Sequence, residues 1–157
     1  MSRPFIASTR PTRTSETREI SELIAVRTPP RAVLVVEPDP EVQSRLASAL
    51  GREGHRVVGT GSGEGAMALI DQWDVDLALV SDSLPGRSGL EIARLIRQRR
   101  PQTTVLIMTE HVEPSTRVAV RAIGAHDCVR KPLDVDAIRA WLCAPVGHLG
   151  GHEAVAQ

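Results

Sequence analysis

The sequence predicts an α/β fold in which a doubly wound, five-stranded parallel sheet is flanked by five helices. The chain has 157 residues, of which 41% are hydrophobic and 24% charged, as in one ordinary globular domain. Short, nearly continuous apolar runs alternate with longer segments of helical period. This alternation is typical of a parallel sheet that helices cover on both faces.

Five apolar runs have the length and composition of buried strands. They lie at residues 32–36, 56–60, 76–81, 104–109 and 126–130. A segment of helical period follows each run, so we expect five strand-helix units within a single domain of residues 32–143. We expect no room in the chain for a separate output domain.

The first of the five helices has the clearest start. Asp39 is predicted as its N-cap and Pro40 as its first helical residue. The apolar face of each helix is predicted from residues at helical spacing. In chain order these faces comprise Val42, Leu46, Ala49 and Leu50; Ala66, Ile70 and Trp73; Leu90, Ala93 and Ile96; Val118, Ala119, Ala122 and Ile123; and Ile138, Trp141 and Leu142.

Both ends of the chain differ in composition from this domain. Residues 1–31 hold six arginines against three glutamates and end in TPPR, so we expect a flexible, basic N-terminal extension. Within it, Ile20, Leu23 and Ile24 have helical spacing and form a candidate docking segment. Residues 144–157 are Gly-rich and without period, as in a flexible tail.

Charge and cysteine content restrict the function. Nineteen Lys and Arg balance nineteen Asp and Glu, so we expect neither nucleic acid nor a membrane surface as a partner. The longest aliphatic run, VLVV, is too short to cross a bilayer. Two cysteines are too few for a disulfide framework or a cysteine metal site, and we therefore expect a reducing cytoplasm.

Candidate functional residues follow the strands, because ligands of open parallel sheets bind in a crevice beyond the carboxyl ends of the strands. Glu37 and Asp39 after the first strand suit a hard cation such as Mg²⁺, although Asp39 is also explained as a helix cap. Ser81 and Thr109 end the third and fourth strands. Lys131, the only lysine, follows the fifth strand, where its ammonium suits a phosphoryl or carboxylate group or is simply solvated.

Three further patterns have competing explanations. Residues 61–66 satisfy G-x-G-x-x-G/A, and Asp82 stands near where a dinucleotide site places its ribose-binding acid, but a glycine-rich bend without a ligand also explains the motif. A basic cluster near the end of the third helix complements the helix dipole and lacks the aromatic residues of nucleic-acid sites. It comprises Arg94, Arg97, Arg99 and Arg100. The histidines have no spacing that predicts a zinc site, and no serine or cysteine has a histidine placed to activate it.

Residues 32–143 resemble a bacterial two-component response-regulator receiver domain of the chemotaxis-regulator type. VLVVEPDPEV resembles the first strand and acidic turn of that family, GSGEGAMALI the opening of its second helix, and LALVSDSLPGRSGLEIARLIR its phosphoacceptor strand and loop. TVLIMTEH resembles the strand with the switch hydroxyl, and GAHDCVRKPLD the last strand with its Lys-Pro. The resemblance implies a flavodoxin-like fold with strand order 2-1-3-4-5, phosphoryl transfer from a histidine kinase to an aspartate, and Mg²⁺ on an acidic pair.

The chain departs from the family pattern at its acidic positions. Counting back four residues from Pro85 places Ser81 at the phosphoacceptor position, and Asp82 stands one residue too late. Adjacent strand residues point to opposite faces, so we expect Asp82 to project away from the crevice unless the strand is shifted or bulged. Glu37 takes the first place of the acidic pair, and Pro38 takes the second.

Other family positions are kept or replaced. Thr109 matches the hydroxyl that senses the phosphoryl group, and Lys131 matches the lysine that pairs with it. Cys128 replaces the usual aromatic switch residue. A serine must lose a proton before it attacks phosphorus, and no base is evident for Ser81; Glu37, with Asp39 at best, is a degenerate Mg²⁺ site.

We therefore predict a stand-alone pseudo-receiver that is not an enzyme and holds no cofactor. Its partner is predicted to be another signalling protein, such as a histidine kinase, regulator or effector, that binds the surface of the fourth helix, fifth strand and fifth helix, or else a second copy of the chain. One alternative is a working phosphoreceiver that uses Asp82 or Asp39 with Mg²⁺. A third hypothesis is a nucleotide-binding module at residues 61–66.

Overall fold

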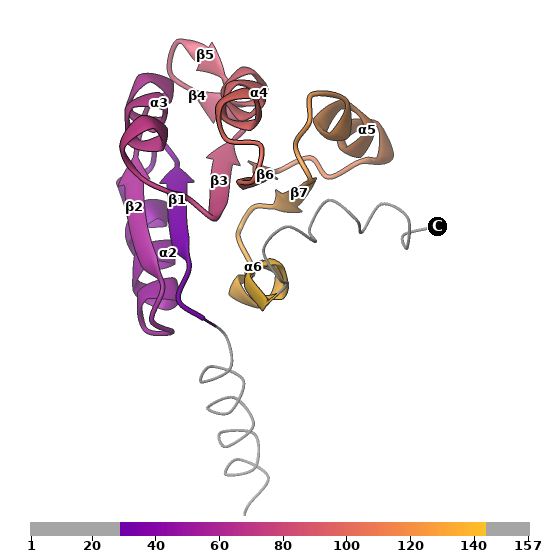
Figure 1. Cartoon of the computed structure of the whole chain (residues 1–157). Helices are drawn as coiled ribbons and strands as arrows, with labels where there is room; N and C mark the ends of the chain where they lie inside the picture. The colour runs from indigo at the N-terminus through magenta and orange to yellow at the C-terminus, as the bar shows by residue number, and fades with distance from the viewer. Residues whose placement is uncertain (1–28, 144–157) are drawn as a thin grey trace, which may run out of the picture.

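The computed structural model describes residues 29–143, which form a five-stranded parallel sheet with its helices (Figure 1). The strands are β1 (Ala32–Val36), β2 (Arg56–Thr60), β3 (Leu77–Ser81), β6 (Thr104–Thr109) and β7 (Asp127–Arg130). They lie in the order β2-β1-β3-β6-β7, which is the predicted order 2-1-3-4-5 when these five strands are counted along the chain. The predicted fold class is therefore confirmed.

Helices cover both faces of the sheet, as its two hydrophobic clusters show. The helices are α2 (Pro40–Gly51), α3 (Gly63–Gln72), α4 (Gly89–Arg99), α5 (Pro114–Ala122) and α6 (Val135–Cys143). Helices α3, α4 and α5 contribute Ile70, Ile92 and Val120 to one cluster, and α2 and α6 contribute Leu50 and Ile138 to the other. The sheet is thus doubly wound, with three helices on one face and two on the other.

Alternation along the central strands divides the core. Leu34 and Val36 of β1 face the cluster of α3, α4 and α5, whereas Val33 and Val35 face the cluster of α2 and α6. All residues of β3 and β6 are buried. Because full burial of one such aliphatic side chain contributes about 1.5–3 kcal/mol, these strands form a rigid support for whatever their carboxyl ends carry.

Helix α2 starts as the sequence predicts. The Asp39 side chain accepts a hydrogen bond from the backbone N–H of Glu41 at 2.9 Å, and Pro40 is the first helical residue. This cap satisfies one of the backbone donors that a helix start leaves open. The carboxylate of Asp39 is therefore already in use within the fold.

The predicted buried face of α5 is wrong at three of its four positions, and only Ile123, directly after the helix, packs against the core. Val118 is 70% exposed, and Ala119 and Ala122 are exposed as well, whereas Val120 is fully buried. Val118 and Val120 point to nearly opposite sides of a helix, so the sequence alone does not decide which of the two valines is buried. Packing against the sheet decides in favour of Val120, and the side with Val118 faces outward.

Trp73 also departs from its predicted place in the core. Helix α3 ends at Gln72, and Trp73 is 38% exposed. The guanidinium carbon of Arg56 lies 4.6 Å from the centre of the Trp73 ring, a cation–π contact across the edge of the sheet. The indole is therefore covered by an arginine of β2 instead of by the helix core.

A short antiparallel hairpin that the sequence did not predict follows β3. It pairs β4 (Ser83–Leu84) with β5 (Arg87–Ser88) and leads directly into α4. The turn contains Gly86 at φ 74°, a left-handed conformation that glycine adopts without strain. The hairpin holds the chain next to the carboxyl end of β3.

The predicted N-terminal extension, with its docking segment, and the predicted C-terminal tail lie outside the described residues, except for positions 29–31. The backbone N–H of Arg31 donates to His55 Nδ1 at 3.0 Å, and that of Ala32 donates to Asp76 Oδ2 at 2.8 Å. Two side chains thus hold the start of β1. Between residues 29 and 143, no helix has the length and apolar character needed to cross a membrane.

Candidate functional site

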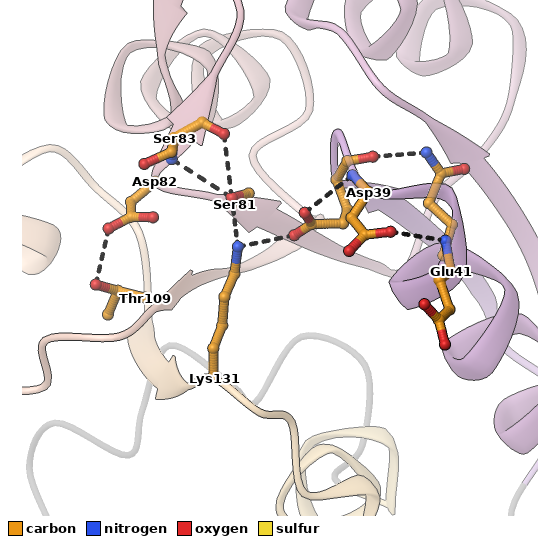
Figure 2. A network of polar contacts seen from close by, with 9 residues as sticks. Asp39, Glu41, Ser81, Asp82, Ser83, Thr109 and Lys131 are labelled. Carbon is orange, nitrogen blue, oxygen red and sulfur yellow. Dashed lines mark hydrogen bonds and ion pairs between the residues drawn. The ribbon is translucent and has the colours of Figure 1, made fainter.

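Side chains from the end of β3 and from the segments directly after β1 and β7 meet at the carboxyl edge of the sheet (Figure 2). The ammonium of Lys131 lies between two of them: it donates a hydrogen bond to Ser81 Oγ at 2.8 Å and lies 2.9 Å from Glu37 Oε2. By the alternation of side chains along a strand, Ser81 and Glu37 lie on the same side of the sheet as Val35 and Leu79. The sequence-predicted residues Glu37, Ser81 and Lys131 therefore form one network.

Glu37 is buried, with 4% of its surface exposed. Its Oε1 accepts the backbone N–H of Asp39 at 3.2 Å. Its Oε2 has no hydrogen-bond donor in good geometry, although the Lys131 ammonium is close enough for an ion pair. The positive charge of Lys131 is thus what balances this buried carboxylate, by attraction more than by a directed hydrogen bond.

Ser81 is fully buried and its hydroxyl is enclosed by partners. Besides the lysine, Ser81 Oγ contacts the Ser83 backbone, donating to its carbonyl oxygen at 3.3 Å and accepting from its N–H at 3.4 Å. The start of α4 presses on the same residue, since a Cβ on Gly89 would lie 1.8 Å from the Ser81 carbonyl oxygen. Glycine at this position allows the helix to begin against the strand.

Asp82 and Thr109 form a second, separate contact. Thr109 Oγ1 donates to Asp82 Oδ2 at 2.8 Å and accepts the backbone N–H of His111 at 3.1 Å. Ser81 is paired with Met108 in the sheet, so the next residues, Asp82 and Thr109, are neighbours on the opposite side of the sheet from Ser81. Asp82 thus points away from Ser81 and toward Thr109.

The alternation of side chains thus divides the predicted site residues into two groups. Sequence reasoning placed Ser81 and Thr109 at one site because both end a strand. It missed the pairing of Asp82 with Thr109, which depends on the register between β3 and β6. The sequence carries no direct signal for that register.

Two other predicted positions lie beside these networks. Cys128 of β7 is buried, and burial raises the pKa of its thiol. The backbone N–H of Cys128 donates to Asp127 Oδ1 at 2.8 Å, and Asp127 also pairs with Arg117 of α5. The Lys131–Pro132 peptide bond is cis, and the N–H of Lys131 donates to the Thr109 carbonyl at 2.8 Å.

The glycine motif at residues 61–66 is explained by packing and capping. Ser62 caps α3 by accepting the N–H of Gly65 at 3.1 Å. A Cβ on Gly65 would lie 2.1 Å from Thr60 Oγ1, and one on Gly63 would lie 2.6 Å from the Ile92 side chain. These glycines let α3 approach β2 and α4 closely, so the motif has a structural reason without a ligand.

Three of the four arginines in the basic cluster at the end of α4 have partners within the fold. Arg97 donates to the carbonyl oxygens of Gly124 and Thr103 at 2.9 and 3.2 Å. Arg99 binds both carboxylate oxygens of Asp71 on α3, at 2.8 and 2.7 Å. Arg100 donates to the Ile70 carbonyl at 3.1 Å. In the described part of the chain, no group of three or more His, Cys, Asp or Glu is placed to hold a metal ion.

Comparison with known proteins agrees with this architecture. Residues 33–142 match the family model described as the response regulator receiver domain. The transcriptional regulatory protein TcrA of Mycobacterium tuberculosis is 37% identical over 112 residues, which cover 71% of this chain and 44% of that protein. The chain spans about half the length of the curated relatives that it matches.

Solved structures give the same result. The receiver domain of the TMAO respiratory system response regulator TorR is 32% identical, with a TM-score of 0.64 and coverage of 71% of this chain and 92% of that one. A CheY-like receiver domain protein from Methanospirillum hungatei JF-1 shares the fold at 22% identity, with a TM-score of 0.67 and coverage of 73% and 94%. With its sheet order and with a family match across most of its length, this chain belongs to the response regulator receiver domain family.

Proposed function

We propose that this chain is an atypical receiver, a pseudo-receiver with serine at the phosphoacceptor position, that acts in two-component signalling through phosphorylation-independent protein interaction. One observation carries the proposal: the buried Ser81 hydroxyl is bonded to Lys131, and the same ammonium neutralises Glu37. The charges of Lys131 and Glu37 offset each other, and the Ser81 hydroxyl is bonded to the same ammonium. An added phosphoryl group would therefore meet a site whose charges are already paired.

The surroundings of Ser81 do not favour attack on a phosphodonor. Nucleophilic attack requires that the hydroxyl lose its proton to a base. The described partners of Ser81 Oγ are an ammonium and the backbone N–H and carbonyl of Ser83, none of which takes up a proton at neutral pH. Ser81 is also fully buried, so a donor would have to open the fold to reach it.

The carboxylates do not fit the Mg²⁺ ion that receivers bind. Mg²⁺ needs hard oxygen ligands that are free to face it. Glu37 Oε1 accepts the N–H of Asp39, Glu37 Oε2 faces Lys131, and Asp39 Oδ1 caps helix α2. Pro38 between these residues offers no side-chain oxygen. The proposal therefore includes no metal-dependent step.

Asp82 is the alternative phosphoacceptor, and its surroundings support a structural role instead. Its Oδ2 is bonded to Thr109, on the opposite side of the sheet from Ser81. Phosphorylation of Asp82 would place the new group on the Thr109 side, away from the lysine that Ser81 contacts. Asp39, the other alternative, caps α2 and would lose that role.

The partner surface is proposed to lie on α5, β7 and α6, and we name it the α5–β7–α6 surface. These elements are the fourth helix, the fifth strand of the main sheet and the fifth helix along the chain. The outward side of α5 carries Val118, Ala119 and Ala122, and Val118 is one of two large hydrophobic residues that the described chain exposes. Single exposed apolar residues are common, but α5 follows Thr109, the last residue of β6, after a short loop. We propose a histidine kinase, regulator or effector as its partner.

The decisive experiment is the intact mass of the full chain after incubation with Mg²⁺ and acetyl phosphate. We expect no phosphoryl adduct on the wild type or on Ser81→Ala. An adduct on the wild type that Asp82→Ala removes would refute the proposal and identify Asp82 as the acceptor. Ser81→Asp is the matched variant that places a carboxylate in the acceptor position.

A second measurement tests the α5–β7–α6 surface. Sedimentation velocity on the wild type and on Val118→Glu distinguishes a second copy from another protein as the occupant. A dimer that Val118→Glu dissociates would replace the proposed partner by a second copy of the chain. Monomers in both samples would support a different signalling protein.

A further inference from the structure

We propose that Asp82 is a positioning residue: its carboxylate holds the Thr109 hydroxyl and thereby fixes the loop that leads into α5. This inference rests on the proposed function, because it explains how the α5–β7–α6 surface keeps one conformation without phosphorylation. It concerns the contact on the opposite side of the sheet from Ser81. Asp82 and Thr109 share no described side-chain hydrogen bond with the side chains of Glu37, Ser81 or Lys131.

The first step is the geometry of Asp82. Its backbone N–H donates to the Met108 carbonyl at 3.0 Å, and its own carbonyl accepts the N–H of Gly89 at 3.1 Å. The backbone of Asp82 is thus fixed between β6 and the start of α4. Its Oδ2 receives the Thr109 hydroxyl at 2.8 Å.

The second step is the geometry of Thr109. This residue is 2% exposed, so its hydroxyl has little access to water and depends on partners within the protein. When the hydroxyl proton points to Asp82, the lone pairs of Oγ1 face the backbone N–H of His111 at 3.1 Å. The carboxylate therefore determines the orientation in which Thr109 accepts from the loop.

The third step leads from the loop to the helix. His111 lies three residues before Pro114, where α5 begins, and the N–H of Arg117 then donates to the Glu113 carbonyl at 3.1 Å. Glu113 at the N-cap has no side-chain hydrogen bond to the helix. The start of α5 therefore has only a weak cap of its own. The two hydrogen bonds that link Asp82, Thr109 and His111, which we call the tether, then contribute to fixing the position of the helix.

Amide hydrogen exchange on the full chain tests this tether. A hydrogen bond to a charged acceptor is worth enough to change a local opening equilibrium about tenfold. We expect Asp82→Ala to raise exchange at His111 and at the first turn of α5 by up to about that factor, although the acceptor of the His111 amide, Thr109 Oγ1, is still present. Thr109→Val should do the same, and the double variant should add nothing further.

Controls separate this role from a general loss of stability. Asp82→Asn keeps an acceptor oxygen and should restore near-normal exchange at His111. Asp74→Ala removes a fully exposed carboxylate elsewhere and should leave that amide unchanged. The proposal is overturned if Thr109→Val raises exchange at the His111 amide and Asp82→Ala does not. It is also overturned if Asp82→Ala raises exchange in β1 and β3 as much as at His111.

The two proposals fail in different ways. A phosphoryl adduct on Ser81 would refute the proposed function and leave the exchange results at His111 unaffected. Unchanged exchange in Asp82→Ala, with no adduct on the wild type, would refute the tether and leave the pseudo-receiver in place.

Discussion

Replacing Lys131 by methionine tests whether its ammonium is what stabilises the buried carboxylate of Glu37. The Glu37 side chain is 5% exposed and the Lys131 side chain 21%. Removing one partner of a buried ion pair costs about 3–5 kcal/mol, because the remaining charge is left without compensation. Since water reaches part of this pair, we expect a loss of about 2 kcal/mol, which lowers the melting temperature of a domain of this size by about 8 °C.

Urea unfolding monitored by circular dichroism measures this loss. Adding Glu37→Gln to Lys131→Met removes the unpaired charge, and the double variant should recover about half of the lost stability. Arg45→Met is the matched control, because the ion pair of Arg45 with Glu41 is exposed and contributes at most about 1 kcal/mol. A Lys131→Met variant as stable as the control, or a double variant no better than Lys131→Met, would refute the reasoning.

Two further predictions concern residues beside the ends of strands β2 and β3. Burial lowers the pKa of His55 below its ordinary value of about 6.5, so the unfolded chain binds the proton first and stability should fall as the pH drops below about 6.5. His55→Asn keeps an acceptor for the Arg31 N–H and should flatten that part of the stability profile between pH 7 and 5; an unchanged slope would contradict this. Gly89→Ala should destabilise by about 1–3 kcal/mol, since its Cβ would collide with the Ser81 carbonyl. Gly51→Ala, whose Cβ meets no atom within 4 Å, is the control in the same urea assay, and equal effects of the two variants would exclude the collision.

The sequence was sufficient for the fold because its elements repeat one pattern. Residues 32–36 are apolar throughout and residues 105–108 are an apolar run between two threonines, a composition typical of strands buried on both faces. The start of α2 was equally clear, since Asp39 and Pro40 have the residue types that a helix start prefers. Local chemistry specifies both features, so no knowledge of the tertiary structure was needed.

The errors arose where tertiary contacts decide between equal local choices. The sequence of α5 has apolar residues on two sides, and only packing shows that Val120 faces the sheet and Val118 does not. The partner of Asp82 depends on which residue of β6 lies beside it, and that register is a property of strand pairing. The sequence therefore identified Ser81, Asp82 and Thr109 as candidate site residues. It did not show that Ser81 lies on one side of the sheet and the other two on the opposite side.

The single lysine of this chain makes the site unusually accessible to chemical labelling. All other basic side chains are arginines or histidines, so reductive methylation with ¹³C-formaldehyde modifies only Lys131 and the α-amino group. The Lys131 side chain is 21% exposed, which leaves a path for the reagent, and the dimethylated amine keeps its positive charge. Its NMR signal would report directly on the ammonium between Glu37 and Ser81, so that pH, added Mg²⁺ and a bound partner can each be followed at one atom without altering the sequence.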